Sequence, residues 1–152
     1  MLKGNILNWM HNGKDFTEIP SGAVSFVYSI TIGGGFYYGK KNFYSTRKKP
    51  FGKKELAQVT DKRKKTYHTI TTESDWKTYC SSSDKVKKMV AEGLEPIKII
   101  ERICYSIKEA TYYENKMLYN YVGMVNCIND SISGKIYREE IQRWGERIVW
   151  RY

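Results

Sequence analysis

The sequence has few of the residues from which metal centres and disulfide frameworks are usually built. Its three cysteines, Cys80, Cys104 and Cys127, are odd in number and widely spaced, and no C-x-x-C pair occurs. Its two histidines, His11 and His68, lie far apart in the sequence. These spacings argue against a zinc site or a disulfide framework, so we expect the cysteines to be small core residues in a reducing compartment.

Long hydrophobic runs are also missing. The sequence holds no run of about 18 apolar residues, and Lys3, Gly4 and Asn5 interrupt the apolar residues near the N-terminus. A membrane-spanning helix or a signal peptide is therefore not expected, and we predict a cytoplasmic protein without a membrane partner. With 152 residues, 41% of them hydrophobic, the chain is large enough for one domain with a single core.

Acidic residues are scarce in one segment, residues 40–65. There eleven cations stand against Glu55 and Asp61, a net charge of +9 in a chain whose formal net charge is +10. Such a segment repels itself and is poor in apolar surface, so we expect an exposed, partly mobile loop. The loop is either solvated and without function, or it binds a polyanion. The polyanion that we expect is nucleic acid, with DNA favoured and RNA not excluded. The cations expected to bind nucleic acid are Lys41, Arg47, Lys48, Lys49, Lys53, Lys54, Lys62, Arg63, Lys64 and Lys65.

Two strands joined by glycines are predicted ahead of the basic segment. From Val24 to Thr31 larger apolar residues alternate with mostly smaller or polar ones, the period of a strand with one face inward. Three glycines at 33–35 can adopt the positive φ angles of a tight reversal, and Phe36-Tyr37-Tyr38 follows them. Residues 24–40 are therefore predicted to form a β-hairpin.

Helices and a third strand are predicted after the basic segment. Ser74 is expected to cap a short helix containing Trp76 and Tyr79, and one of the serines at 82–83 a second helix that ends at Gly93. The isoleucine-rich residues 96–104 favour a strand. After it, the S-x-x-E spacing that begins at Ser106 predicts a helix running to about residue 121.

Glu114 lies on the apolar stripe of this last predicted helix, four residues from both Ala110 and Leu118. A carboxylate on an inward face is costly unless it is paired or bound to a cation. No Lys or Arg lies three or four residues away to pair with it on the helix. Glu114 therefore either lies at the edge of the stripe, solvated or paired with a cation from elsewhere in the fold, or binds a hard divalent metal ion, which prefers oxygen ligands.

The predicted hairpin carries a family signature. Phe26-Val27-Tyr28, a glycine turn and then Tyr37-Tyr38-Gly39-Lys40 resemble the two strands of the GIY-YIG nucleases, in the degenerate form of some phage-encoded members. The resemblance spans about residues 24–130, although Phe26 replaces the first glycine and Tyr38 the usual aliphatic residue. It implies an α/β fold with a small, mainly antiparallel three-stranded sheet flanked by helices, here with a basic loop insertion.

The resemblance also implies an activity and a set of site residues. The activity is endonucleolytic hydrolysis of DNA phosphodiester bonds with Mg²⁺ or Mn²⁺, and Glu114 is the implied metal ligand. Lys40 and the metal could lower the pKa of a tyrosine enough for it to activate water. For the family's helix-borne arginine the sequence offers Arg47 or Lys77, and we favour Lys77 with Tyr79 beside it. The implied catalytic residues are Tyr28, Tyr37, Lys40, Lys77, Tyr79, Glu114 and Asn126.

The expected organisation is an N-terminal extension over 1–22, a nuclease-like domain over 23–130 with a basic insertion at about 41–73, and a C-terminal helical segment over 131–152. Two other functions fit the sequence. One is a non-catalytic nucleic-acid-binding protein of the same fold, and the other is a basic partner-binding or inhibitory protein whose loop contacts an acidic protein surface.

Overall fold

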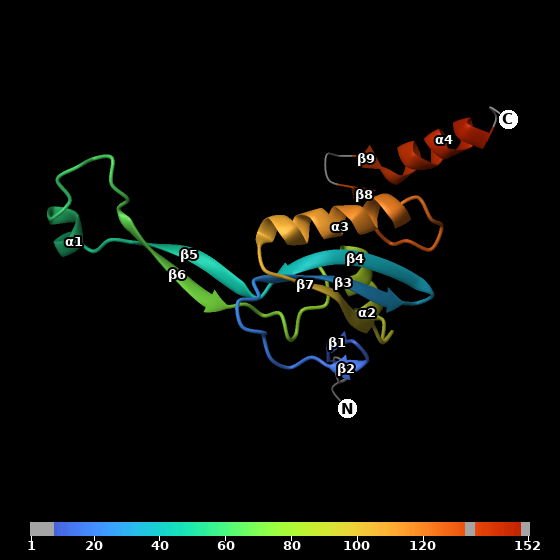
Figure 1. Cartoon of the computed structure of the whole chain (residues 1–152), viewed down its shortest axis with the longest axis horizontal. Helices are drawn as coiled ribbons and strands as arrows, with labels where there is room; N and C mark the ends of the chain where they lie inside the picture. Colours follow the sequence, from blue (N-terminus) through green and yellow to red (C-terminus); the bar gives the residue numbers. More distant parts are fainter. Residues whose placement is uncertain (1–7, 133–135, 150–152) are drawn as a thin grey trace.

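The computed structural model of the chain describes residues 8–132 and 136–149. Residues 1–7, which include the interrupted apolar run near the N-terminus, and parts of the predicted C-terminal segment, 133–135 and 150–152, lie outside these ranges. A rounded body carries a long arm that projects to one side (Figure 1). Within the described ranges, no helix has both the length and the apolar character needed to cross a membrane.

The body is built on a mixed five-stranded sheet with the order β2-β1-β7-β3-β4. Its centre is the predicted antiparallel group β7-β3-β4, so the α/β fold is confirmed. The sheet is larger than the predicted three strands because β1 pairs in parallel with β7, and β2 pairs with β1. The strands are β1 (Met10–His11), β2 (Lys14–Asp15), β3 (Ser25–Ile32), β4 (Gly35–Asn42) and β7 (Ile97–Cys104).

A two-residue turn closes the β3–β4 hairpin. Ile32 pairs with Gly35, which leaves Gly33 and Gly34 as the loop, with φ angles of 56° and 77°. Positive φ at both central residues is typical of the type I′ turn, whose twist suits a hairpin. The predicted hairpin is confirmed, and its glycines set the register of the two signature strands.

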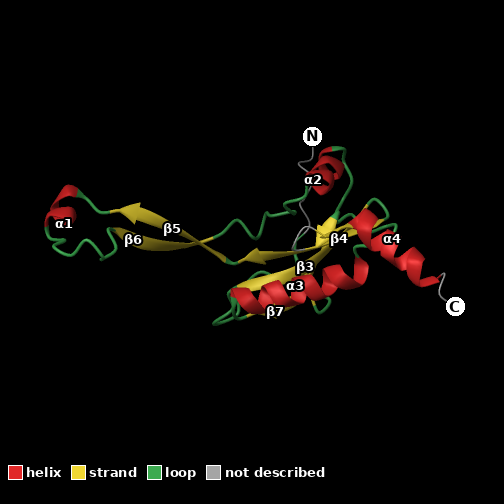
Figure 2. Cartoon of the chain, turned by 90° about the horizontal axis from the view of Figure 1, so that it is seen from above, coloured by secondary structure: helices red, strands yellow, loops and turns green. Residues whose placement is uncertain are grey.

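Strand β3 is buried on both faces, whereas the alternation of its residues predicted one inward face. Phe26 and Ile30 pack with Trp9 and other aromatic residues on one side. On the other side Val27 packs against the helix α3 (Ile107–Tyr121), which covers that face of the sheet (Figure 2). The outward set of β3 is therefore buried because a helix that follows much later in the chain lies on it.

The N-terminal segment, which we expected as an extension, contributes to the body. The indole of Trp9 is 1% exposed, lies at the centre of the aromatic core, and donates a hydrogen bond of 2.7 Å to the Trp76 carbonyl oxygen. Phe16 stacks on Phe43 and meets Trp76 edge-on. Residues 8–22 thus close one side of the sheet.

Two of the three helices predicted between residues 74 and 121 form. Helix α2 (Asp84–Ala91) begins after Ser83, whose hydroxyl accepts a hydrogen bond from the Val86 amide. Helix α3 begins after Ser106, whose hydroxyl accepts a hydrogen bond from the Glu109 amide. In a capping box the glutamate would accept a hydrogen bond from the amide of Ser106 itself. Here the Glu109 carboxylate accepts one from the amide of the preceding residue, Tyr105.

The helix predicted from Ser74 is wrong. Residues 75–79 make a single turn, in which the amides of Thr78 and Tyr79 donate to the Asp75 carbonyl oxygen. The physical reason is the burial of Trp76, which is 0% exposed and donates its indole N–H to Glu73. Packing of this indole in the aromatic core fixes the chain in a turn and overrides the helical signals.

The basic segment is exposed, as expected, but the predicted loop is wrong for its first part, which forms one strand of a projecting arm. Strand β5 (Tyr44–Pro50) pairs along its whole length with β6 (Tyr67–Glu73), and the short helix α1 (Lys53–Ala57) lies near the tip (Figures 1 and 2). An antiparallel ladder satisfies the backbone without a core, and its side chains can point into solvent. The prediction was based on the charge of residues 40–65. It did not take into account the β-branched threonines of β6, which favour a strand.

The C-terminal described residues form a small hairpin and a helix. Strand β8 (Ser131–Ile132) pairs with β9 (Ile136–Tyr137), and the helix α4 (Arg138–Val149) follows. Ile141 packs on the cluster that Leu118 and Val122 form near the end of α3. This contact joins α4 to the body.

Candidate active site

Gly39 makes room for the phenol of Tyr28. The two residues pair directly between β3 and β4, and Tyr28 is completely buried. A Cβ atom at position 39 would lie 2.5 Å from the Tyr28 hydroxyl oxygen and 2.7 Å from Cζ. The glycine of the second signature strand is thus required by space, because any side chain there would displace the tyrosine.

Three tyrosines meet on this side of the sheet. The Tyr28 ring centroid lies 6.3 Å from that of Tyr37 and 6.0 Å from that of Tyr79. Burial, followed by the interaction with Tyr79, raises the pKa of Tyr28 well above its usual range, although a hydrogen bond with Ser81 lowers it. The Tyr28 hydroxyl is therefore even harder to ionise than that of an ordinary tyrosine, and its ring packs edge-on against Tyr79.

Tyr37 is the more accessible of the two signature tyrosines. Its hydroxyl lies 3.3 Å from the Ser82 hydroxyl, at the start of the segment that leads into α2. Burial raises the pKa of Tyr37, hydrogen bonds with Ser82 and Ser81 lower it, and the Tyr79 and Glu114 groups raise it further. Lys40 is not among the groups that shift the pKa of Tyr28 or Tyr37, and burial is the largest cause at both.

Glu114 lies on the inward side of α3, with 19% of its side chain exposed, and pairs with Lys40 of β4. The Lys40 Nζ is 3.5 Å from the Glu114 Oε2 and donates a hydrogen bond of 2.5 Å to the Thr111 hydroxyl. Burial raises the pKa of Glu114, and the charge of Lys40 and their hydrogen bond lower it. The Glu114 carboxylate is thus paired with a cation from elsewhere in the fold, Lys40, which is one of the alternatives that the sequence allowed.

The two groups of residues lie on opposite sides of β4. Alternation along the strand directs Lys40 toward α3, whereas Tyr37 and Lys41 point to the tyrosine side. Strand β4 is the last strand of the sheet, and residues 126–129 bond to its free side at Phe36 and Tyr38. Lys40 and Glu114 therefore lie on the α3 side of β4, and Tyr37 and Lys41 on the other side. Glu114 is one of the groups that raise the pKa of Tyr37.

The cation beside the tyrosines is Lys41. Its Nζ lies 2.6 Å from the Asp75 carboxylate and 4.1 Å from the centroid of the Tyr79 ring. Lys77, which we favoured for this role, instead pairs with Glu73 at 3.9 Å and borders a small pocket beside Trp9. Arg47 lies out on the arm. The predicted helix that would carry Lys77 does not form, and in the structure it is Lys41 that contacts a tyrosine ring.

The asparagine side chain that bonds to β4 is that of Asn129, whereas the sequence pointed to Asn126. The Asn129 side chain accepts a hydrogen bond from the Tyr38 amide and donates one to the Tyr38 carbonyl oxygen, at 2.9 and 2.8 Å. Asn126 is exposed, and its backbone oxygen accepts from the Phe36 amide. A buried amide, 7% exposed, thus covers part of the β4 edge. The sequence signal for Asn129 is weak, because nothing distinguishes the two asparagines by spacing.

A comparison with protein families agrees with this arrangement of two signature strands, a tyrosine packed against a glycine, and a glutamate on a helix. The family model described as "Putative endonuclease segE, GIY-YIG domain" matches residues 9–141. The chain belongs to this GIY-YIG family. Searches of curated proteins and of solved structures returned no significant match. The GIY-YIG match begins at Trp9, in agreement with the place of that residue in the core.

The Glu114 carboxylate is of the chemical type that a hard cation takes as a ligand. In the described part of the chain, no three His, Cys, Asp or Glu residues gather in a way that could hold a metal ion. Mg²⁺ does not need such a group, since it keeps several waters and is often held by one or two carboxylates together with substrate phosphates. Glu114 supplies one such carboxylate, and Lys40 lies 3.5 Å from it.

Proposed function

We propose that this chain is a divalent-metal-dependent endonuclease that hydrolyses DNA phosphodiester bonds at the edge of β4. The observation that carries the proposal is the half-buried carboxylate of Glu114, held on the inward side of α3 beside Lys40 of β4. A protein that only binds nucleic acid gains nothing from a carboxylate beside phosphates. Membership of an endonuclease family supports the same conclusion.

The chain's own residues supply orientation and charge for this hydrolysis. A water oxygen attacks phosphorus, the bond to the leaving oxygen breaks, the water loses a proton and the leaving oxygen gains one. Tyr37, neutral because its pKa is raised, orients the attacking water through its hydroxyl. Lys41 neutralises a phosphate oxygen, and Lys40 keeps Glu114 ionised. A divalent cation bound at Glu114 would stabilise the negative charge that develops on the phosphate and the leaving oxygen.

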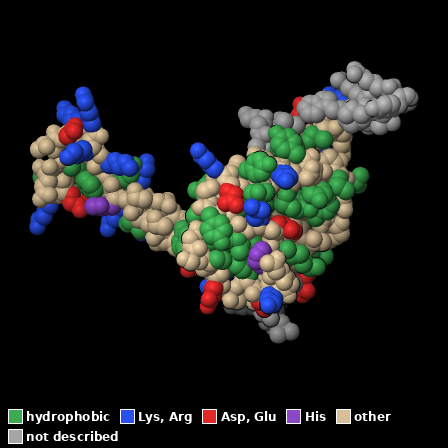
Figure 3. All heavy atoms as spheres, viewed as in Figure 1, with side chains coloured by type: hydrophobic (Ala, Val, Ile, Leu, Met, Phe, Trp, Pro, Cys, Tyr) green, Lys and Arg blue, Asp and Glu red, His purple; other side chains and the backbone are tan. Residues whose placement is uncertain are grey.

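The arm supplies the electrostatic attraction in this proposal. Lys and Arg side chains crowd the end of the arm (Figure 3). Every residue of β5, which runs along the arm, is exposed. Exposed cations bind backbone phosphates without reading bases, so the arm would raise affinity for DNA of any sequence. Of the ten cations from Lys41 to Lys65 named above, eight remain the proposed nucleic-acid-binding set. Arg47 and Lys49 leave it because they share a face of the arm with His68, which is bonded to the Glu55 carboxylate.

One observation favours a second candidate, a nucleic-acid-binding protein of the same fold without catalytic activity. The ion pair between Lys40 and Glu114 already satisfies the carboxylate, which then needs no metal. The two functions differ in what Glu114 does, and a single substitution separates them.

The test is the Glu114→Gln variant, incubated with supercoiled plasmid with and without Mg²⁺ or Mn²⁺. We expect the unaltered chain to nick or linearise the plasmid only with the metal ion, and the variant to lose this cleavage while its DNA affinity stays equal or rises slightly. Glu95→Gln, which removes an exposed acid ahead of β7, is the matched control and should cleave normally. Absence of cleavage by the unaltered chain in either metal ion would favour the second candidate.

A further inference from the structure

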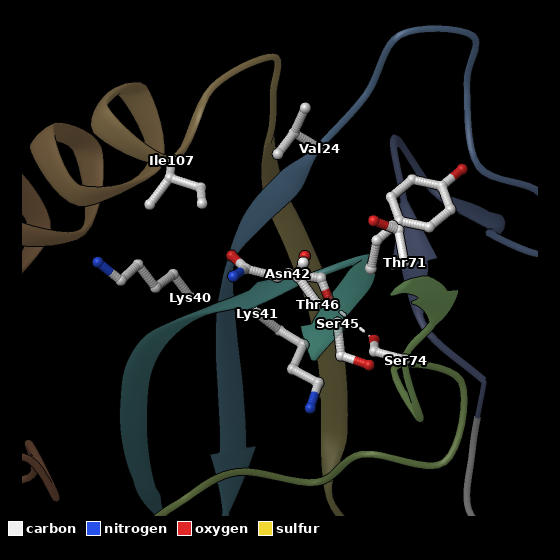
Figure 4. A pocket seen from close by; sticks show the side chains of 10 residues that line it. Val24, Lys40, Lys41, Asn42, Ser45, Thr46, Thr71, Ser74 and Ile107 are labelled. Atoms are coloured by element: carbon white, nitrogen blue, oxygen red, sulfur yellow. Dashed lines mark hydrogen bonds between the residues drawn. The ribbon is translucent and has the colours of Figure 1, made fainter. Parts of the chain in front are cut away.

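A groove lies where the arm leaves the body, next to the candidate active site. It has a volume of about 790 Å³ and is lined by residues of β4, of both arm strands and of the start of α3. Figure 4 shows Lys40 directed toward α3 and Lys41 toward the opposite side. Apolar atoms make up most of its surface, but hydroxyl, amide and ammonium groups also line it, among them those of Lys40, Lys41, Asn42, Thr46, Thr71 and Ser74.

One face of the arm continues this groove. Directly paired residues of an antiparallel ladder share a face, and the face changes with each step along the strand. Thr46 pairs with Thr71 at the groove, and the next pair on the same face is Lys48 with Thr69. The pair after that is Pro50 with Tyr67. We call this face, from Thr46 to Tyr67, the groove face of the arm.

Two lysines converge at the far end of the groove face. The Nζ atoms of Lys48 and Lys65 lie 4.6 and 5.9 Å from the centroid of the Tyr67 ring. An aromatic ring flanked by two ammonium groups holds both charges at a defined place, and each ammonium keeps donors free for an anion. The groove face thus carries hydroxyls at its base and fixed cations at its end.

The opposite face of the arm is occupied by contacts within the arm. Lys49 pairs with His68, whose Nε2 lies 2.8 Å from the Glu55 carboxylate. The ring of His68 also lies 4.6 Å from that of Phe51. A carboxylate on this face repels phosphates, so the cations here, Arg47 and Lys49, are less suited to DNA than those on the groove face.

We propose that the groove and the groove face of the arm form one continuous track for the backbone phosphates of duplex DNA, which leads from Lys40 and Lys41 to Lys48 and Lys65. The proposal rests on the proposed function, since it extends the same site. Six steps along β5 cover about 20 Å, the axial length of roughly six base pairs. A two-stranded ribbon also fits the major groove of a duplex, so the arm can follow the DNA closely.

The test compares two pairs of substitutions that remove equal charge from the same arm. Lys48→Gln with Lys65→Gln alters the groove face, and Arg47→Gln with Lys49→Gln alters the opposite face. Binding to a labelled 30-base-pair duplex is followed by fluorescence anisotropy at several salt concentrations, with chelator present so that no cleavage occurs. Thermal melts of both variants verify that the fold is retained.

We expect the groove-face pair to weaken binding on the order of tenfold or more and to lower the slope of log affinity against log salt by roughly two units. The opposite-face pair should change affinity far less and leave the slope nearly unchanged. Equal effects of the two pairs, or a larger effect of the opposite-face pair, would overturn the track while leaving the nuclease proposal standing. If the unaltered chain does not bind the duplex at low salt, both the track and the proposed function fail.

Discussion

Lys40 and Glu114 form an ion pair on the α3 side of β4, with the ammonium nitrogen 3.5 Å from the carboxylate oxygen. The pair has a chemical consequence, because burial raises the pKa of Glu114 and Lys40 opposes that rise. A carboxylate must be ionised to bind a hard cation, so under the proposed function Lys40 extends the pH range in which Glu114 is able to bind the metal ion.

We predict that Lys40→Met moves the acidic limb of the cleavage rate to higher pH. Removing the lysine removes the effect that lowers the pKa of Glu114, so a higher pH is needed to ionise it. The measurement is the initial rate of plasmid nicking between pH 5 and 9 at saturating Mg²⁺. Lys116→Met, which removes an equal charge from the exposed side of α3, is the control. An unshifted limb in Lys40→Met would mean that Glu114 does not titrate under the control of Lys40.

The two signature tyrosines should differ in their response to loss of the hydroxyl. Tyr37→Phe is expected to lower the cleavage rate by about a hundredfold, the effect typical of a lost proton-transfer or orienting group. Tyr28→Phe should act less, through the position of Tyr79, because the Tyr28 hydroxyl is buried and bonded to that residue. Single-turnover rates at equal DNA occupancy test this order, with the exposed Tyr112→Phe as the control. If both signature variants cleave normally, these tyrosines serve only the core.

Gly39→Ala should destabilise the fold through Tyr28. The added methyl would lie 2.5 Å from the buried hydroxyl, and overpacking of this kind typically costs about 1–3 kcal/mol. Combined with Tyr28→Ala, the same change should cost little more than Tyr28→Ala alone, because the clash is gone. Thermal melts of the two single variants and the double variant measure the coupling. Additive losses would show that Gly39 is needed for its backbone and not for the space that it leaves.

The predictable parts of the fold are those whose signals are local. The glycines at 33–34 predict the hairpin turn, and Ser83 and Ser106 predict where α2 and α3 begin. The apolar stripe around Glu114 predicts an inward carboxylate, and the structure places it there. In each case the residues that decide the structure lie within a few positions of one another.

The parts that could not be predicted depend on contacts between distant segments. Trp9 belongs to the core because it meets Trp76, 67 residues later. The burial of Trp76 then prevents the helix that would have carried Lys77, so Lys41 lies beside the tyrosines in its place. The arm was not predicted for another reason. The high charge of residues 40–65 suggested a loop, whereas β5 in this segment pairs with β6 beyond it in a ladder that needs no hydrophobic core.

The turn at the tip of the arm supports a last prediction, about Lys62, Arg63, Lys64 and Lys65. These four exposed residues lie between α1 and β6, so replacing all of them with glutamine should leave the thermal midpoint almost unchanged. Binding should weaken to a similar degree for unrelated DNA sequences, because phosphate contacts position a protein without reading bases. Each cation that no longer meets a phosphate should also flatten the dependence of log affinity on log salt by roughly one unit.

Anisotropy titrations over a range of salt concentrations, with two duplexes of unrelated sequence, measure both effects. The matched control replaces Lys87, Lys88, Lys108 and Lys116, four exposed lysines of α2 and α3, and so removes the same charge from the body. If attraction came only from the net charge of +10, both quadruple variants would weaken binding equally. A larger decrease of slope in the arm variant would show that the tip touches the backbone. An unchanged slope would mean that the charge at the tip serves a partner other than DNA, since four exposed cations that met phosphates would have to release counterions.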